Sequence, residues 1–121
     1  MILVDTSVWI KHLRAGSTPL ATLLEQGQVL IHPWVLGELA CGHLRHRDQV
    51  LPLLGNLARS VVATEVEILQ AIERHRFMGR GIGYVDAGLL TSCLLSGCRI
   101  WSLDRRLLAV AEPMGLAHGP S

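Results

Sequence analysis

Four of the ten acidic residues stand where the surrounding sequence could give carboxylates a chemical role. They are Asp5, Glu38, Asp86 and Asp104. Asp5 directly follows the apolar run 2–4, and Asp104 directly follows the run 99–103. Both runs are typical of buried strands, and the carboxyl ends of parallel strands meet at one edge of a sheet. We therefore expect Asp5 and Asp104 to lie near each other, where ligands of such sheets bind.

Glu38 and Asp86 fall within two predicted helices, on the side that carries apolar residues. The neighbours three and four positions away are Trp34, Val35 and Cys41 for Glu38, and Leu89, Leu90, Cys93 and Leu94 for Asp86. Residues at these spacings share one face of a helix. Carrying a carboxylate into the interior costs on the order of several kcal/mol unless a cation pairs with it. The pattern predicts that both acids face the site formed by Asp5 and Asp104.

Few cations in the sequence could neutralise four converging carboxylates. Lys11 is the only lysine, and the arginines fall mostly in clusters typical of exposed surface. A salt bridge explains any single acid well, but it explains four together poorly. Oxygen-rich clusters select hard cations such as Mg²⁺ or Mn²⁺. The reaction favoured by such a site is phosphodiester hydrolysis, with one ion activating water and a second, about 4 Å away, stabilising the leaving oxygen.

Strands and helices alternate along the whole chain. We predict strands at 2–4, 29–31, 61–62, 99–103 and 116–117, and helices after Ser7 and at 17–27, 34–41, 50–57, 64–78, 84–96 and 104–111. Thr6 or Ser7 should cap the first helix, and Thr64 with Glu67 should form a capping box. Pro52 suits only the beginning of its helix. The alternation predicts an α/β fold with a central, mainly parallel sheet covered by helices on both faces.

Length and composition are those of one globular domain spanning residues 1–121. No apolar run approaches the roughly 20 residues that span a bilayer, and no secretory signal precedes the first strand, so we expect a cytoplasmic protein without a membrane partner. Cys41, Cys93 and Cys98 form no CxxC pair and are predicted to be free, buried thiols. A net charge of +1 gives no overall basic field, so any attraction for nucleic acid must come from local clusters of basic residues.

The order of these motifs resembles that of the PIN-domain ribonucleases and, within them, the VapC toxins of bacterial VapBC toxin–antitoxin modules. The resemblance rests on Val4-Asp5-Thr-Ser-Val-Trp-Ile10, Gly37-Glu38-Leu39, Tyr84-Val-Asp86-Ala and Ser102-Leu-Asp104. Each motif alone is a weak signal, but the four occur in the right order and extend over essentially the whole chain. The resemblance implies a PIN-like three-layer α/β/α sandwich. It also implies an endoribonuclease that depends on Mg²⁺ or Mn²⁺, cuts structured RNA such as tRNA or ribosomal RNA, forms a homodimer and is inhibited by a VapB antitoxin.

The resemblance also assigns roles to individual residues. Asp5, Glu38 and Asp86 match the metal-binding acids of the family, and Asp104 matches its fourth acidic position. Thr6, Ser7 and Ser102 would orient these acids without binding the metal themselves. The candidate RNA contacts are Lys11, Arg14, Arg80 and Arg105. The apolar surface expected around Trp9, Trp34 and the leucine-rich helices suggests surfaces for the homodimer and the antitoxin.

Other interpretations of the sequence are weaker. A phosphoacceptor receiver domain resembles this chain in length, but it needs paired acids after the first strand and a late lysine, and no lysine follows Lys11. A haloacid dehalogenase-type phosphatase needs a second aspartate at position 7, which is serine. A zinc site at Cys41, His43 and His46 lacks a fourth ligand. The remaining alternative is an inactive PIN fold that only binds RNA or protein.

Overall fold

The computed structural model describes residues 1–119. Its centre is a four-stranded sheet in the order β3-β2-β1-β4, and every pairing is parallel. The strands are β1 (Ile2–Val4), β2 (Val29–Ile31), β3 (Ala58–Arg59) and β4 (Arg99–Trp101). The helices are α1 (Thr6–Ala15), α2 (Thr18–Glu25), α3 (Pro33–Cys41), α4 (Arg47–Gly55), α5 (Glu65–His75), α6 (Tyr84–Ser96) and α7 (Arg105–Ala111), with a 3₁₀ turn at Glu112–Met114.

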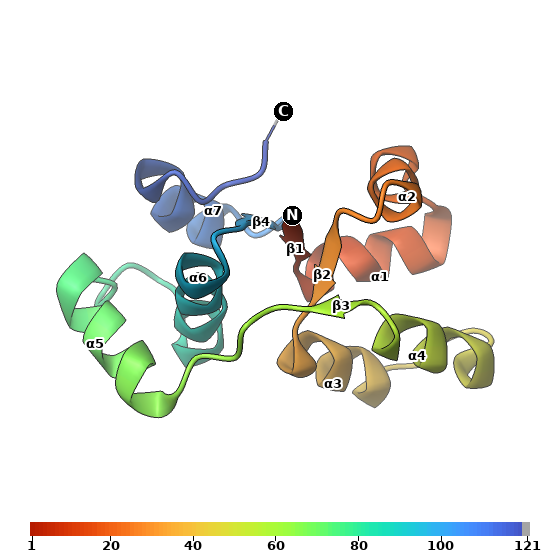
Figure 1. Ribbon diagram of the computed structural model, residues 1–121, viewed down its shortest axis with the longest axis horizontal. Helices are drawn as coiled ribbons and strands as arrows, with labels where there is room; N and C mark the ends of the chain where they lie inside the picture. The colour runs from red at the N-terminus through yellow and green to blue at the C-terminus, as the bar shows by residue number, and fades with distance from the viewer. Residues whose placement is uncertain (120–121) are drawn as a thin grey trace.

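The helices cover the sheet from two sides. Figure 1 shows α1 and α2 on one side of the strands, with α5 and α6 on the other. The predicted α/β fold with a mainly parallel central sheet is therefore confirmed. In the part of the chain that the structure describes, every helix is too short or too polar to cross a membrane.

The core lies where the two central strands meet the covering helices. Leu3, Val4, Ile31 and Ile100 come from the strands, and none of these side chains is exposed. Burying one side chain of this size contributes about 1.5–3 kcal/mol relative to leaving it in water. The burial of both strand faces explains why β1 and β2 are continuously apolar.

Most helix ends follow from the sequence. Ser17 accepts a hydrogen bond from the backbone N–H of Leu20, and Thr64 with Glu67 forms the predicted capping box. Gly97 ends α6 with φ +65°, a left-handed conformation that glycine adopts without strain. The predicted cap of α1 is wrong, because the N-cap position is Asp5 and neither Thr6 nor Ser7 occupies it.

Two other helix boundaries also differ from the prediction. The helix containing Pro52 begins at Arg47, so this proline lies inside α4 and leaves one carbonyl of the helix without its usual N–H partner. The helix after Thr64 ends at His75 and not at Met78, since Arg76 adopts a left-handed conformation with φ +54°. The predicted helices therefore exist, but some of their ends differ from the prediction. The sequence pattern does not reveal where the backbone turns.

The strand predicted at Val61 and Val62 is wrong. Ala58 and Arg59 pair with Leu30 and Ile31 instead, and both valines are exposed. The end of α4 at Gly55 fixes which residues reach the sheet, and this outweighs the preference of valine for strands. The predicted strand at 116–117 is reduced to one parallel bridge between Ile100 and Ala117.

Two expectations about buried side chains need correction. Cys93 and Cys98 are free and buried as predicted, but Cys41 is free and exposed. Trp9, predicted to contribute to a partner surface, is a core residue with only 2% of its surface exposed. Its position on α1 turns the ring inward, so the apolar surface available to partners must lie elsewhere.

Candidate active site

Asp5 sits where β1 ends and α1 begins. Its backbone N–H donates to the carbonyl of Trp101 at 2.9 Å, which fixes it beside the end of β4. The hydroxyls of Ser7 and Ser102 both donate to Oδ2 of Asp5, at 2.9 Å and 2.7 Å. Of the residues expected to support Asp5, Thr6 does not do so, because its buried Oγ1 makes no hydrogen bond. One carboxylate oxygen is thus held from two sides, and the other remains for a ligand.

Ser102 and Ser7 also connect Asp5 to Asp104. The strand predicted to reach Leu103 stops at Trp101, because the backbone then turns toward these two serines. The N–H of Leu103 donates to Oγ of Ser7 at 3.0 Å, and the N–H of Asp104 donates to Oγ of Ser102 at 3.0 Å. The buried hydroxyl of Ser102 therefore sets the spacing between the ends of β1 and β4.

Asp104 also stabilises the start of a helix. Its Oδ1 accepts hydrogen bonds from the N–H groups of Arg106 and Leu107 and so caps α7. The side chain is exposed, and its second oxygen is not engaged by the cap. A cap of this kind contributes about 1 kcal/mol to stability, so a structural role can account for this carboxylate without a bound ion.

Asp86 and Glu38 interact with the other acids and not with cations. Partial burial raises the pKa of Asp86, and the charges of Asp5 and Asp104 raise it further, while a backbone N–H of Gly83 opposes the shift. Partial burial also raises the pKa of Glu38, with additional contributions from Asp5 and Asp86. Among the groups responsible for these two shifts there is no arginine, lysine or histidine. This is the electrostatic pattern of like charges held near one another.

The expectation that Glu38 is carried into the interior is wrong. Its neighbours Val35 and Leu39 are buried, but the Glu38 side chain itself is exposed at the rim of the site. Asp86 is half-buried, and Leu89, Leu90 and Cys93 on its face are buried. The helical face predicts burial well for Asp86, whereas Glu38 lies at the border of the apolar stripe of α3.

The carboxylates of the site are ligands that suit a hard divalent cation, although their oxygens do not converge on one position. Carboxylate oxygens are what Mg²⁺ and Mn²⁺ prefer, and Asp5, Glu38 and Asp86 offer them. Over residues 1–119, no group of three His, Cys, Asp or Glu side chains could hold a metal ion as it stands. Glu38 is exposed and its side chain is long, so rotation about its χ angles could move its oxygens toward Asp5 and Asp86.

An aromatic contact joins the helices that carry Glu38 and Asp86. His32 caps α3 by accepting a hydrogen bond from the N–H of Trp34, and burial lowers the pKa of this histidine to about 4. The Trp34 ring lies 5.1 Å from the His32 ring and 6.0 Å from that of Tyr84. On α6, Gly88 meets the edge of the same indole. We call the Trp34 indole, which lies between α3 and α6, the spacer. The sequence did not predict it, and its only sign there is the glycine at position 88 within an otherwise apolar helix.

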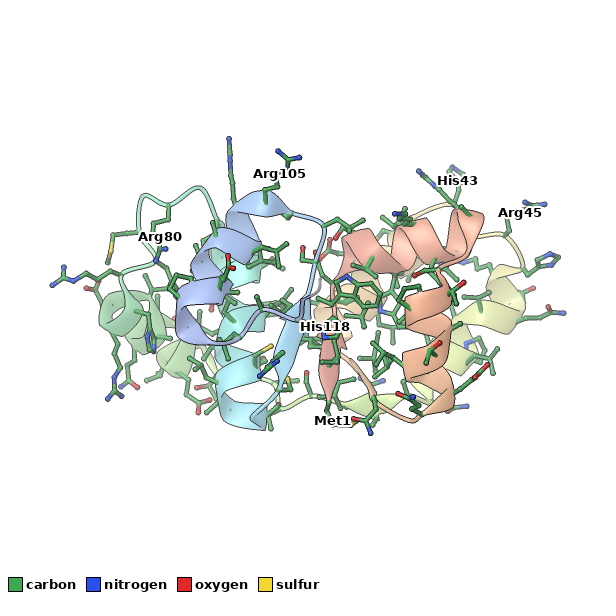
Figure 2. All side chains as sticks on the ribbon, turned by 90° about the horizontal axis from the view of Figure 1, so that it is seen from above. Met1, His43, Arg45, Arg80, Arg105 and His118 are labelled. Atoms are coloured by element: carbon green, nitrogen blue, oxygen red, sulfur yellow. The ribbon has the colours of Figure 1, made fainter. Side chains whose placement is uncertain are left out.

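Basic residues flank the acids at the same edge of the molecule. Figure 2 shows Arg80 and Arg105 on one flank, with His43 and Arg45 on the other, all toward the edge opposite Met1. Since every strand runs away from the Met1 edge, this is the edge where the strands end. Lys11 and Arg14 on α1 are exposed as well. Cations on both flanks suit a polyanion lying across the acids.

Comparison with known sequences gives a consistent picture. The profile of the PIN domain family matches residues 2–113. Ribonuclease VapC32 of Mycobacterium tuberculosis, in the strains CDC 1551 and H37Rv, is 49% identical over 118 residues, which make up 97% of this chain and 95% of the relative.

Two solved structures share the fold. PAE2754 from Pyrobaculum aerophilum matches with a TM-score of 0.62 and 17% identity, over 92% of this chain and 79% of that one. FitAcB from Neisseria gonorrhoeae matches with a TM-score of 0.65 and 16% identity, over 93% of this chain and 94% of that one. At these identities the similarity concerns the fold alone.

Proposed function

Because the chain belongs to the PIN domain family, among the VapC ribonucleases, we propose that it is a divalent-metal-dependent endoribonuclease, the toxin of a VapBC module. The observation that carries this proposal is the interaction of like-charged acids from strand ends and helices, in which the pKa values of Asp86 and Glu38 are raised and no cation is among the causes. We propose Asp5, Glu38 and Asp86 as the residues that hold Mg²⁺ or Mn²⁺, with Asp104 as a fourth, outer acid. The proposed substrate is structured RNA, such as tRNA or ribosomal RNA, and the proposed place of action is the cytoplasm.

In this proposal the acids hold the cation, and the basic residues around them hold the RNA. Ser7 and Ser102 orient Asp5 through Oδ2, so Oδ1 would be the oxygen available to hold the cation. Asp86 in the first turn of α6 and Glu38 on α3 would supply the other carboxylate oxygens, and the contacts of Trp34 with Tyr84 and Gly88 join the two helices that carry them. When bound, the cation neutralises charge on the phosphate and makes water a stronger nucleophile near neutral pH. Lys11, Arg14, Arg80 and Arg105 hold the flanking phosphates by charge.

Metal removal tests the proposed activity. We expect the purified protein, free of antitoxin, to cut a pool of structured cellular RNA with Mg²⁺ or Mn²⁺, to stop when a chelator is added, and to resume when excess metal is restored. Asp5→Asn, purified in parallel, controls for a contaminating nuclease. Equal cutting by wild type and Asp5→Asn would reject the assignment. A wild type that binds RNA but stays silent with either metal would favour the inactive binding module.

We also propose that the protein forms a homodimer through α5 and α6 and that a VapB antitoxin inhibits it. Exposed apolar side chains gather on these two helices, which lie alongside each other in Figure 1. The proposed contact uses four of them, Val66, Leu69, Leu94 and Leu95. Burying such a face in a symmetric contact would remove it from water.

Light scattering tests the homodimer. We expect the wild type to have twice the mass of one chain and Leu69→Glu to have the mass of one, because a charge at the centre of the contact would be buried twice. Leu53→Glu is the matched control, since Leu53 on α4 is 68% exposed and lies outside the proposed contact. Wild type that scatters as a single chain at micromolar concentration would rule this dimer out.

A further inference from the structure

A pocket of about 110 Å³ opens beside the acids, between α1 and the segment that joins α3 to α4. Its walls are the apolar side chains of Ile10, Leu13, Leu39 and Leu44. Glu38 lines the pocket as well and is also one of the acids whose charge interacts with Asp5 and Asp86. The pocket therefore shares Glu38 with the candidate active site.

The rim of this pocket is basic. Arg14, His43 and Arg45 border the apolar walls, and Glu38 is the only acid among the lining residues. Figure 2 places His43 and Arg45 at the edge of the molecule that also carries Arg105. An apolar floor under guanidinium groups is the environment in which unstacked RNA bases are held, because the planar guanidinium stacks on the base and pairs with phosphate.

The size of the pocket limits what can enter. Pockets that enclose whole drug-sized molecules measure roughly 300–1,000 Å³, so 110 Å³ admits a single planar group. We propose that this pocket receives one unpaired base of the RNA, from a nucleotide next to the bond that is cut, and thereby contributes to the choice of cleavage site. The inference rests on the proposed ribonuclease function, because it assumes that a phosphate of the same strand lies at Asp5, Glu38 and Asp86.

Charge favours RNA over an acidic protein segment as the occupant. A base is uncharged and can lie against Glu38, while the phosphates on either side of it can reach Arg14 and Arg45. An acidic protein segment would be attracted to the same arginines, but its carboxylates would enter the pocket beside Glu38 and be repelled there, whereas a nucleotide carries its charge outside the base. The pocket also lies beside the acids that would hold the scissile phosphate, which is where a base of an adjoining nucleotide must go.

Filling the pocket tests the inference. A pool of short RNAs with a randomised single-stranded stretch is digested with the wild type in Mg²⁺, and the cut ends are sequenced. We expect a base preference at one position beside the cut. In Leu44→Trp, which fills the pocket from a loop, that preference should fall by about 10-fold or more, the range lost when one base contact is removed. Leu44→Ala is less disruptive and should weaken the same preference to a smaller degree.

An abasic nucleotide at that position provides the matching change in the RNA. It should slow the wild type about as much as Leu44→Trp slows cutting of the intact RNA, and it should slow Leu44→Trp little further. Leu53→Trp on exposed α4 is the control and should keep the wild-type pattern. The inference is overturned if Leu44→Trp cuts with an unchanged preference, including the case in which it only escapes the antitoxin. A wild type that cuts no RNA would instead reject the proposed function itself.

Discussion

Asp86→Asn is expected to reduce metal-dependent RNA cleavage by more than about 100-fold while leaving the metal-free protein at least as stable as the wild type. Loss of a residue that only supports a metal ligand costs roughly 10- to 100-fold, so loss of a ligand should cost more. Stability should not fall, because burial and the charges of Asp5 and Asp104 all disfavour the ionised carboxylate. Asparagine keeps the size of the side chain and can still accept the hydrogen bond from Gly83.

The sign of the pH dependence follows from the raised pKa of Asp86. In the folded protein this carboxyl holds its proton to a higher pH than in the unfolded chain, so wild type loses stability as pH rises from about 4 through the folded pKa. His32 has the opposite effect on stability over part of this range, because its pKa is lowered to about 4 in the folded protein. Its contribution to stability grows as the pH rises from about 4 toward the usual pKa of histidine. The informative quantity is therefore the stability of Asp86→Asn minus that of wild type, from which the contribution of His32 cancels.

That difference should be near zero at about pH 3, grow in favour of Asp86→Asn toward neutral pH, and shrink when Mg²⁺ is added. Urea unfolding in a chelating buffer at several pH values measures it. Asp48→Asn is the matched control, since Asp48 also lies in the first turn of a helix, α4. Removing its charge should cost about 0.3–1 kcal/mol through the helix dipole alone. An Asp86→Asn protein that loses more stability than Asp48→Asn above about pH 4 would show that Asp86 serves as half of a salt bridge.

Residues at the ends of strands were the easiest part of the site to predict. Asp5 and Asp104 follow apolar runs, and in a parallel sheet the end of a run is enough to place the next residue at the ligand-binding edge. Local sequence patterns could not show that Ser102 holds Asp5, because the two residues are 97 positions apart in the chain. Only the family resemblance pointed to Ser102. Ser7 was correctly expected to support Asp5, whereas Thr6 beside it points its hydroxyl into the protein without a partner.

Exposure and helix ends were predicted less well, because they depend on tertiary contacts. The spacing around Glu38 indicates an apolar face but not how far the next element covers it, and α1 leaves the pocket open above this residue. The two valines at 61 and 62 have the highest strand preference in their segment, yet they lie past the point where the chain pairs with β2. In each case a local preference was correct and the position of a neighbouring element decided the outcome.

Gly88→Ala is expected to lower both stability and cleavage, although alanine favours helices. In an open position the substitution would stabilise α6 by up to about 1 kcal/mol. Here the added Cβ would lie 2.4 Å from Cζ3 and 2.9 Å from Cη2 of Trp34. Overpacking of this kind costs about 1–3 kcal/mol, so after the gain in helix preference we expect a net loss of up to roughly 2 kcal/mol. Since the indole lies between α3 and α6, relief of the clash by a shift of either helix moves Glu38 relative to Asp86, and a misplacement near 1 Å can reduce the cleavage rate by up to about 100-fold.

Two further variants separate this spacer effect from general destabilisation. Gly55→Ala in α4, where the new Cβ meets nothing within 4 Å, should keep full cleavage and be as stable as wild type or slightly more so. Trp34→Phe removes the ring edge that the Cβ added at position 88 would strike, so combining it with Gly88→Ala should recover stability and part of the cleavage rate, a coupling that a double-mutant cycle measures. If Gly88→Ala instead behaved like Gly55→Ala, the contact between Trp34 and Gly88 could not be what sets the distance between Glu38 and Asp86. The acids would then have to be positioned through β1, β2 and β4 and not through this contact.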